Sequence, residues 1–361
     1  MEYNKLPHPH VGLPTFAYLC RELNRLKKTR FAWMHESSKC APQRALKDLD
    51  VAFQNFFQGR AHFPRFKNRK HGAGSFTLDG AIKIRPDGIR LPRIGWVRLK
   101  ERGYLPSNTH INSATISERA GRWFVSINVT EETLVTTSIQ GPVAGVDRGI
   151  DRLLMVSDDT SVENPRALKR YERKLKHLQK ALSRKKKNSA NRKKALLALR
   201  RLHYRIVSTR KDVISKATTI LARTKSIIVV EDLGVKNMLG NHYLAESITD
   251  ASMAEVVYQL EYKTIWYGSR LVKADRWYPS TKRCSRCGNV KKHMDLSERI
   301  YHCEACGLTI DRDLNAARNL EQWPGVARTL ETPVEGGVQP FHAVQPLHEA
   351  GTKSLEGGPR P

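Results

Sequence analysis

Apolar residues recur along the chain with different spacings, and each spacing predicts a different kind of element. Over residues 1–60 they return every three or four positions, as at Phe16, Leu19 and Leu23, which predicts amphipathic helices. Over residues 61–138 short runs alternate between apolar and polar side chains and are separated by turn-forming residues. This alternation predicts strands. The N-terminal part is therefore expected to form a helical segment followed by a β-rich unit.

Residues 139–321 have the pattern of an α/β domain. The apolar runs Val143–Asp147 and Ser226–Glu231 each end on a carboxylate, and Leu153–Ser157 is the expected hairpin partner of the first run. The other expected elements are a helix over 250–268, a strand over 269–275 and a helix within 311–320. Residues 322–361 are rich in proline and glycine and lack an apolar period, which predicts a disordered tail.

A helical insert is expected over residues 164–221. Its first arm has apolar residues at steps of three and four, from Leu168 through Tyr171 to Leu182, which is the spacing of a coiled-coil seam. A break at 187–191 predicts the turn of a helical hairpin. The basic residues at its tip are Arg184, Lys185, Lys186, Lys187, Arg192, Lys193 and Lys194. They form either a solvated helix face or a contact surface for a nucleic-acid backbone, and the lack of paired glutamates favours the second.

The composition indicates a protein that binds a polyanion. The chain has 361 residues, with 63 Lys and Arg against 35 Asp and Glu, and a formal net charge of +28. Such a surface repels itself unless a polyanion neutralises it, so nucleic acid is the leading partner, ahead of an anionic membrane or a ribosomal location. Because 40% of the residues are hydrophobic, disorder of the whole chain is excluded, and the length allows two or three domains.

The sequence shows no signal for a membrane or for secretion. No stretch approaches the roughly 18 uninterrupted apolar residues of a membrane span. The leader Met1–His8 has no charged region followed by an apolar core, so no signal peptide is predicted. We therefore expect a soluble, cytoplasmic protein without a membrane partner.

Four of the six cysteines form two Cys-x-x-Cys pairs separated by fifteen residues: Cys284, Cys287, Cys303 and Cys306. Each pair can form a tight knuckle, and together they supply the four thiolates of one Zn²⁺ ion. Gly288 and Gly307 follow the pairs, where a tight turn needs a residue that tolerates positive φ. A four-thiolate shell leaves no open coordination position, so this zinc is expected to be structural. Cys20 lies outside the pairs in a helical pattern that predicts a buried thiol.

Three acidic residues are notable in so basic a chain. Asp147 and Glu231 end apolar strands, and Asp313 opens a helix. Each also has an ordinary structural interpretation: Asp147 as a turn residue, Glu231 as a strand-end cap and Asp313 as a helix N-cap. Together they can bind hard cations such as Mg²⁺ or Mn²⁺. Two such ions can activate a water molecule and stabilise the leaving oxygen of a phosphodiester, and the polyanion-binding surface favours this joint interpretation.

The motifs around these residues resemble the TnpB family, which is encoded by bacterial and archaeal insertion sequences and is related to the type V CRISPR effectors. The matching segments are Val146–Gly149, Val230–Leu233, Asp311–Leu320 with the cysteine pairs before it, and, in the N-terminal half, Leu46–Phe53 and Phe63–Lys67. The resemblance covers nearly all of residues 15–320. The segment Asp313-Leu314-Asn315-Ala316-Ala317 fits the family's Asp-x-Asn-Ala-Ala pattern, which favours Asp313 over its rival Asp311 as the third acid.

The resemblance implies an α/β RNase H-like (RuvC) nuclease domain over residues 139–321, with the helical insert at 164–221 and a zinc ribbon at 277–308. It also implies a helical recognition-like segment over residues 1–60 and a β-barrel-like wedge domain over residues 61–138. Family members usually begin with a further strand and helix. Only a short leader occupies that place here, so the wedge domain is expected to lack one strand.

The family's activity implies a metal-dependent, RNA-guided DNA endonuclease, historically called a transposase, in the prokaryotic cytoplasm near the nucleoid. Its partners would be a guide RNA from the parent element and a double-stranded DNA target. Its cofactors would be one structural Zn²⁺ ion and two catalytic Mg²⁺ or Mn²⁺ ions held by Asp147, Glu231 and Asp313. Two alternatives stay open: an RNA-guided DNA-binding protein that does not cut, and a transposase that itself performs strand transfer. The sequence leaves the oligomeric state open.

Overall fold

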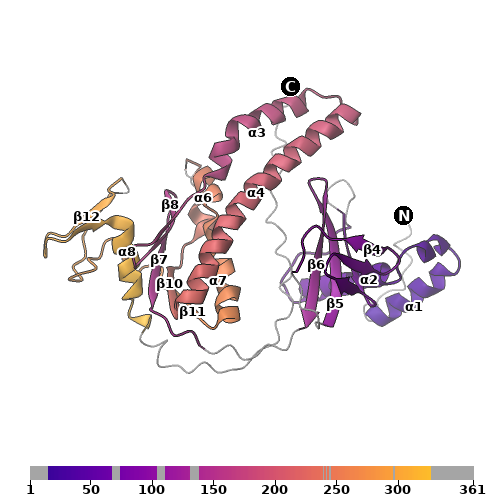
Figure 1. Cartoon of the computed structure of the whole chain (residues 1–361), viewed down its shortest axis with the longest axis horizontal. Helices are drawn as coiled ribbons and strands as arrows, with labels where there is room; N and C mark the ends of the chain where they lie inside the picture. Colours follow the sequence, from indigo (N-terminus) through magenta and orange to yellow (C-terminus); the bar gives the residue numbers. More distant parts are fainter. Residues whose placement is uncertain are drawn as a thin grey trace. The chain divides into compact units, whose positions relative to one another are not determined.

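The computed structural model describes residues 15–66, 74–103, 110–130, 138–238, 240, 242–243, 245–295 and 297–326. The chain divides into two compact units (Figure 1). The first unit comprises residues 1–133 and 166–212, and the second comprises residues 134–165 and 213–361. Most of the predicted tail and the predicted leader lie outside the described residues. In the described part of the chain, no helix combines the length and the apolar character needed to cross a membrane.

The first unit begins with the predicted helices. Helix α1 (Phe16–Lys27) starts after Thr15, whose hydroxyl accepts a hydrogen bond from the backbone N–H of Tyr18 at 3.3 Å. A short 3₁₀ helix, η2 (Ala32–Glu36), leads to α2 (Cys40–Phe57). Cys20 is half-buried on α1, so the prediction of a fully buried thiol is wrong.

The β-rich part of the first unit forms two antiparallel sheets of three strands each. One has the order β1 (Ser75–Asp79), β5 (His110–Arg119), β6 (Arg122–Thr130), and the other has the order β2 (Lys83–Arg85), β3 (Gly88–Leu91), β4 (Gly95–Arg98). Their buried faces share one core, which contains Leu78, Ile89 and Ala114. The described strands thus form two separate sheets, and no pairing among them closes a barrel.

The predicted helical hairpin is present as α3 (Ala167–Ser183) and α4 (Ala190–Thr224). The turn between them contains Asn188 with φ +64°, within the predicted break. The predicted seam is confirmed, because Leu168 and Tyr171 of α3 pack against the buried Leu202 and Ile206 of α4. Residues 166–212 of the hairpin belong to the first unit, where the Tyr204 ring lies 5.8 Å from Phe124 of β6.

The second unit is built on a five-stranded mixed sheet of order β11-β10-β7-β8-β9. Its strands are β7 (Ala144–Arg148), β8 (Arg152–Val156), β9 (Ser161–Glu163), β10 (Ile227–Glu231) and β11 (Arg270–Ala274). Strand β10 is parallel to both β7 and β11, whereas β8 is antiparallel to its two neighbours, β7 and β9. Strands β7, β8, β10 and β11 lie where the apolar runs of the sequence predict them, whereas β9 was not predicted.

Both faces of this sheet are covered by helices, which explains why β10 is a continuous apolar run. Ile228 and Val230 pack against the C-terminal half of α4 and against α7 (Met253–Tyr267). Ile227 and Val229 point to the opposite face and pack against Leu320 of α8 (Arg312–Glu321). Figure 1 shows α8 on one side of the sheet and α4 with α7 on the other.

The remaining elements of the second unit are short. Helices α5 (Val235–Met238) and α6 (Ala245–Ala251) precede α7, and the strands β12 (Ile300–His302) and β13 (Thr309–Asp311) form a separate hairpin. The folded part of the chain extends past the predicted boundary at residue 322, because Trp323 and the buried Val326 pack against the same core as Ile227.

Candidate active site and metal centre

The three predicted acidic residues come from neighbouring elements of the second unit. Asp147 lies on β7 and Glu231 is the last residue of β10. Because Val230 pairs with Val146 in parallel register, the two acids follow at adjacent strand positions near the carboxyl ends of these strands, where α/β sheets bind ligands. Asp313 lies in the first turn of α8. Helix α8 lies so close to β7 that a Cβ atom at position 145 would overlap the main-chain oxygen of Ala317. This close approach is possible because residue 145 is glycine.

The charges of Glu231 and Asp313 act on the Asp147 carboxyl group. Burial, together with the negative charges of Glu231 and Asp313, raises the pKa of Asp147 to about 8. The guanidinium and backbone N–H of Arg148 oppose this rise only in part. Asp147 therefore holds a proton near neutral pH unless a cation compensates for its charge.

This raised pKa predicts how stability depends on pH in the metal-free protein. The folded state binds the Asp147 proton more tightly than the unfolded state, so stability from this group is present below pH 4 and is lost as pH rises towards 8. Asp147→Asn removes the penalty. We expect its free energy of unfolding to exceed that of the parent by a margin that grows from pH 5 to pH 8 and reaches on the order of a few kcal/mol. Thermal unfolding of both proteins in EDTA, at each pH, measures this difference in stability.

A matched control for this measurement is Asp158→Asn. Burial alone would raise the pKa of Asp158, but hydrogen bonds from Lys225 and Thr160 outweigh it and lower this pKa to about 2. The same substitution at Asp158 should therefore not stabilise the protein at pH 8. Equal melting temperatures for Asp147→Asn and the parent at pH 8 would show that Asp147 is not protonated there.

The structure separates Asp313 from its rival Asp311. The Asp311 carboxylate caps α8 by accepting hydrogen bonds from the backbone N–H groups of Asp313 and Leu314 at 2.9 and 3.1 Å. It also pairs with Arg152 at 3.0 Å. The Asp313 side chain contacts the Arg312 guanidinium at 3.3 Å, and its charge acts on Asp147. Asp311 thus caps the helix, whereas the charge of Asp313 acts on Asp147. We refer to Asp147, Glu231 and Asp313 as the acidic cluster.

Two residues that the sequence analysis missed hold Glu231. The buried Arg148 guanidinium donates hydrogen bonds to the main-chain carbonyls of Glu231 and, at 3.1 Å, of Met253. The Ser280 hydroxyl donates to the Glu231 carboxylate. A weak signal for Arg148 is present in the sequence, because a charged residue directly follows Asp147 at the end of an apolar run.

The four predicted cysteines meet in space. The Sγ atoms of Cys284 and Cys306 lie 3.6 Å apart, as do those of Cys287 and Cys303. Zinc–sulfur bonds of about 2.3 Å in a tetrahedron place sulfurs roughly 3.8 Å apart, so the donor set and its spacing fit Zn²⁺. Among the described residues, this is the one group of three or more potential ligands whose atoms all lie within 4.8 Å of one another. The three carboxylates are less tightly gathered.

The two knuckles around these cysteines have matching geometry. Gly288 and Gly307 have φ values of +78° and +70°, as predicted, and each donates a backbone hydrogen bond of 2.9 Å to the first cysteine of its pair. Burial raises the pKa of the Cys303 thiol, but backbone N–H groups of Cys306 and Ala305 outweigh it and lower the pKa to about 6. Cys303 is thus prepared to bind a cation as a thiolate.

Helix α8 connects the cysteine knuckles to the acidic cluster. The fully buried Asn315 donates a hydrogen bond to the Arg283 carbonyl at 2.7 Å and accepts one from the Ser285 N–H at 3.0 Å. The fully buried Asn319 donates to the carbonyls of Ser280 and Arg283 at 2.7 and 2.6 Å. The sequence analysis assigned no role to these amides, although two asparagines four positions apart in an alanine-rich helix are a signal.

At the hairpin tip, the predicted basic residues are not equivalent. The side chains of Arg184, Lys185, Lys186, Lys187, Lys193 and Lys194 are exposed. Arg192 is half-buried and donates a hydrogen bond to the Leu182 carbonyl at 3.0 Å. It therefore supports the turn of the hairpin, a structural role that the predicted contact with nucleic acid did not include.

A second basic surface, missed in the sequence, covers one face of the β2-β3-β4 sheet. Its exposed residues are Lys83, Arg85, Arg90, Trp96 and Arg98. Arg90 pairs with Lys83 on one side and with Trp96 on the other, so these three form a row across the sheet. The Arg85 guanidinium lies 4.5 Å from the Trp96 ring centre. The opposite face carries the apolar Ile84 and Ile89, which join the core.

Comparison with known proteins places the chain in a family. Residues 125–242 match the family described as "Probable transposase" (OrfB_IS605), and residues 254–320 match the family described as "Cas12f1-like, TNB domain". These matches define the class as insertion-sequence and CRISPR-related nucleic-acid proteins.

Individual relatives specify the family. A Streptomyces pristinaespiralis protein whose name describes an RNA-guided DNA endonuclease is 39% identical over 82% of this chain and 75% of its own length. InsQ of Escherichia coli, named in the same way, is 33% identical over 81% of this chain and 76% of its own length. A Cas12f1–sgRNA–target DNA complex aligns with a TM-score of 0.38 at 15% identity, over 86% of each chain. The chain belongs to the TnpB family, as its motifs predicted.

Proposed function

We propose that this chain is a metal-dependent, RNA-guided DNA endonuclease of an insertion sequence. The observation that supports the proposal most directly is the raised pKa of Asp147, which is caused by burial and by the negative charges of Glu231 and Asp313. Both relatives described above carry names that describe RNA-guided DNA endonucleases. The net charge of +28 suits partners that are polyanions, namely a guide RNA and a DNA target.

We infer that residues 139–321 form an RNase H-like (RuvC) nuclease domain with the hairpin as its insert; its sheet lies in the second unit, and residues 166–212 of the insert lie in the first. The mixed sheet supports this inference because its two acid-bearing strands are adjacent and parallel. By the same inference, residues 277–308 form a zinc ribbon, residues 1–60 a recognition-like segment and residues 61–138 a wedge-like domain.

The chemistry of each donor set matches the proposed cofactor. Carboxylate oxygens suit Mg²⁺ or Mn²⁺, and the four thiolates suit Zn²⁺. Asp147, Glu231 and Asp313 would hold Mg²⁺, which would supply activation of water and stabilisation of the leaving oxygen of a phosphodiester. The protein's own part is to hold these acids in place: Arg148 fixes the backbone at Glu231, and Ser280 orients its carboxylate.

Two surfaces of the first unit are proposed to contact nucleic-acid backbone: the hairpin tip and the basic face of the β2-β3-β4 sheet. The test concerns the first. At the hairpin tip, Lys185, Lys186 and Lys187 are exposed, and replacing them with alanine should weaken binding equally for all sequences. Each lost phosphate contact should lower the slope of log K against log salt by about 0.9 on duplex DNA. Arg192→Ala should instead destabilise the hairpin and leave the slope unchanged. An identical slope in the triple variant would show that these lysines only face solvent.

The proposed function is tested with the purified full-length chain. RNA that copurifies with it is sequenced, and DNA matching the guide portion of that RNA is offered with Mg²⁺ or with EDTA. We expect a discrete RNA species and cleavage that requires both Mg²⁺ and sequence matching. Guided binding without cleavage would support the non-cutting alternative. Joining of element ends by this chain alone would support strand transfer.

A further inference from the structure

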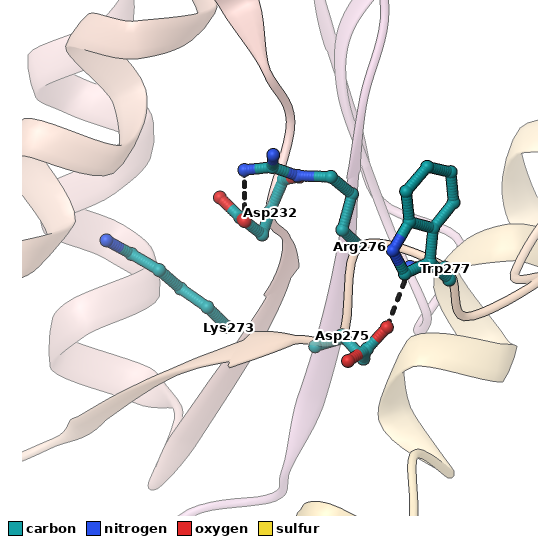
Figure 2. A pocket seen from close by; sticks show the side chains of 6 residues that line it. Asp232, Lys273, Asp275, Arg276 and Trp277 are labelled. Carbon is teal, nitrogen blue, oxygen red and sulfur yellow. Dashed lines mark hydrogen bonds and ion pairs between the residues drawn. The ribbon is translucent and has the colours of Figure 1, made fainter.

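An open pocket of about 590 Å³ adjoins the acidic cluster within the second unit (Figure 2). Its lining residues are Asp232, Lys273, Ala274, Asp275, Arg276 and Trp277. Glu231 directly precedes Asp232 and pairs in register with Ala274, so the pocket begins where the acid-bearing strand ends. Ligands of α/β sheets bind at this edge, and the volume lies in the range of small-ligand sites.

One tight turn holds both the pocket and Glu231. The Asp275 carboxylate accepts a hydrogen bond of 2.8 Å from the backbone N–H of Trp277, and the Asp275 carbonyl accepts one of 3.0 Å from the N–H of Tyr278. Three residues beyond Trp277, Ser280 donates to the Glu231 carboxylate. A group bound at Trp277 is thereby held at a fixed position relative to Glu231.

Trp277 itself has no evident role in folding. Trp277 is 86% exposed, although the turn fixes its backbone. Among the described residues, no aromatic ring or cation contacts its ring. In Figure 2 its ring points away from Asp232 and Lys273. An indole exposed on a rigid backbone presents a flat surface on which a planar ring can stack.

The pocket also contains cations that can exchange partners. Arg276 donates to the Asp232 carboxylate at 2.6 Å, and Lys273 pairs with Glu261 at 2.7 Å. These side chains are 51% and 47% exposed, and exposed ion pairs contribute little to stability. A phosphate entering the pocket can therefore replace a carboxylate on Arg276 at small cost, and the guanidinium can bind it in bidentate fashion.

We propose that this pocket is a nucleotide subsite, which holds one unpaired nucleotide of a DNA strand beside the scissile phosphate. The base stacks on Trp277 and the phosphate of that nucleotide lies at Arg276. This assignment rests on the proposed endonuclease function. Stacking on one aromatic ring accepts every base, which suits a protein whose sequence specificity comes from a guide.

The test uses photocrosslinking with the full-length Asp147→Ala chain, which should not cut. The probe is a fifteen-nucleotide single strand of 5-iodo-2′-deoxyuridine, because its base, 5-iodouracil, crosslinks on irradiation to aromatic rings stacked on it. We expect mass spectrometry to find the crosslink at Trp277. Trp266 is the internal comparison, because it is 61% exposed on α7 of the same unit and lies outside the pocket lining.

Binding of the same strand provides a second readout. Trp277→Ala should raise its Kd about tenfold, Trp277→Phe should keep the Kd within about twofold of the parent, and Trp266→Ala should change it little. An unchanged Kd for Trp277→Ala, or equal crosslinking at Trp266 and Trp277, would overturn the subsite. If the parent chain still cuts guided DNA in that case, the subsite fails while the proposed function stands. If the parent chain does not cut guided DNA, the proposed endonuclease function is refuted, whatever the result at Trp277.

Discussion

Asp147→Ala, Glu231→Gln and Asp313→Asn should each cut guided target DNA at least two orders of magnitude more slowly than the parent. Loss of residues that merely support metal ligands costs about 10–100-fold, so loss of a ligand itself should exceed that range. Binding should be as tight as in the parent or tighter, because each change removes a negative charge from a DNA-binding surface. Cleavage rates and filter-binding affinities on the same DNA measure the two effects.

Asp311→Asn distinguishes the two candidate acids on α8. This variant removes the charge that pairs with Arg152 but keeps a side-chain oxygen that can cap α8, so we expect at most a slightly lower melting temperature and cleavage that persists. Asp158→Asn is the control for an acid that pairs with Lys225 away from the cluster. If Asp311→Asn abolishes cutting and Asp313→Asn does not, the third acid is Asp311. If all three variants in the cluster still cut, these residues do not form a metal-dependent nuclease centre.

The sequence predicted those elements whose packing produces a strong periodic signal. Strand β10 is buried on both faces, so its apolar run is uninterrupted and the carboxylate at its end is conspicuous. The seam of the hairpin follows the coiled-coil spacing and is buried as expected. The cysteine spacing likewise determined which four residues would meet, because each knuckle is a local structure that needs no long-range information.

Residues that act through long-range contacts could not be predicted in this way. The role of Gly145 depends on how closely α8 approaches β7, and that of Asn315 depends on a carbonyl at Arg283, 32 residues earlier. The basic face of the β2-β3-β4 sheet arises from three separate short strands, which share a face only after they pair. Arg192 has the same residue type as its neighbours, yet a hydrogen bond across the turn gives it a structural role.

The largest effect on folding is expected at the cysteines. Cys303→Ser should abolish stoichiometric zinc binding, because a structural zinc contributes about 10 kcal/mol or more of apparent binding energy that is also folding energy. Cys20→Ser is the matched control, since Cys20 is half-buried and lies outside the cluster. Zinc content by atomic emission and protease sensitivity of the segment between Asp275 and Asp313 measure the effect.

The loss of zinc should also reach the acidic cluster, although no acid is changed. Asn315 and Asn319 bind carbonyls of the first knuckle and of Ser280, and Ser280 holds the Glu231 carboxylate. A loosened knuckle therefore removes support from both Glu231 and α8, which carries Asp313. Cleavage by zinc-depleted parent protein should return when Zn²⁺ and Mg²⁺ are added together and not with Mg²⁺ alone. Full activity of Cys303→Ser with normal zinc content would contradict both the four-thiolate site and this coupling.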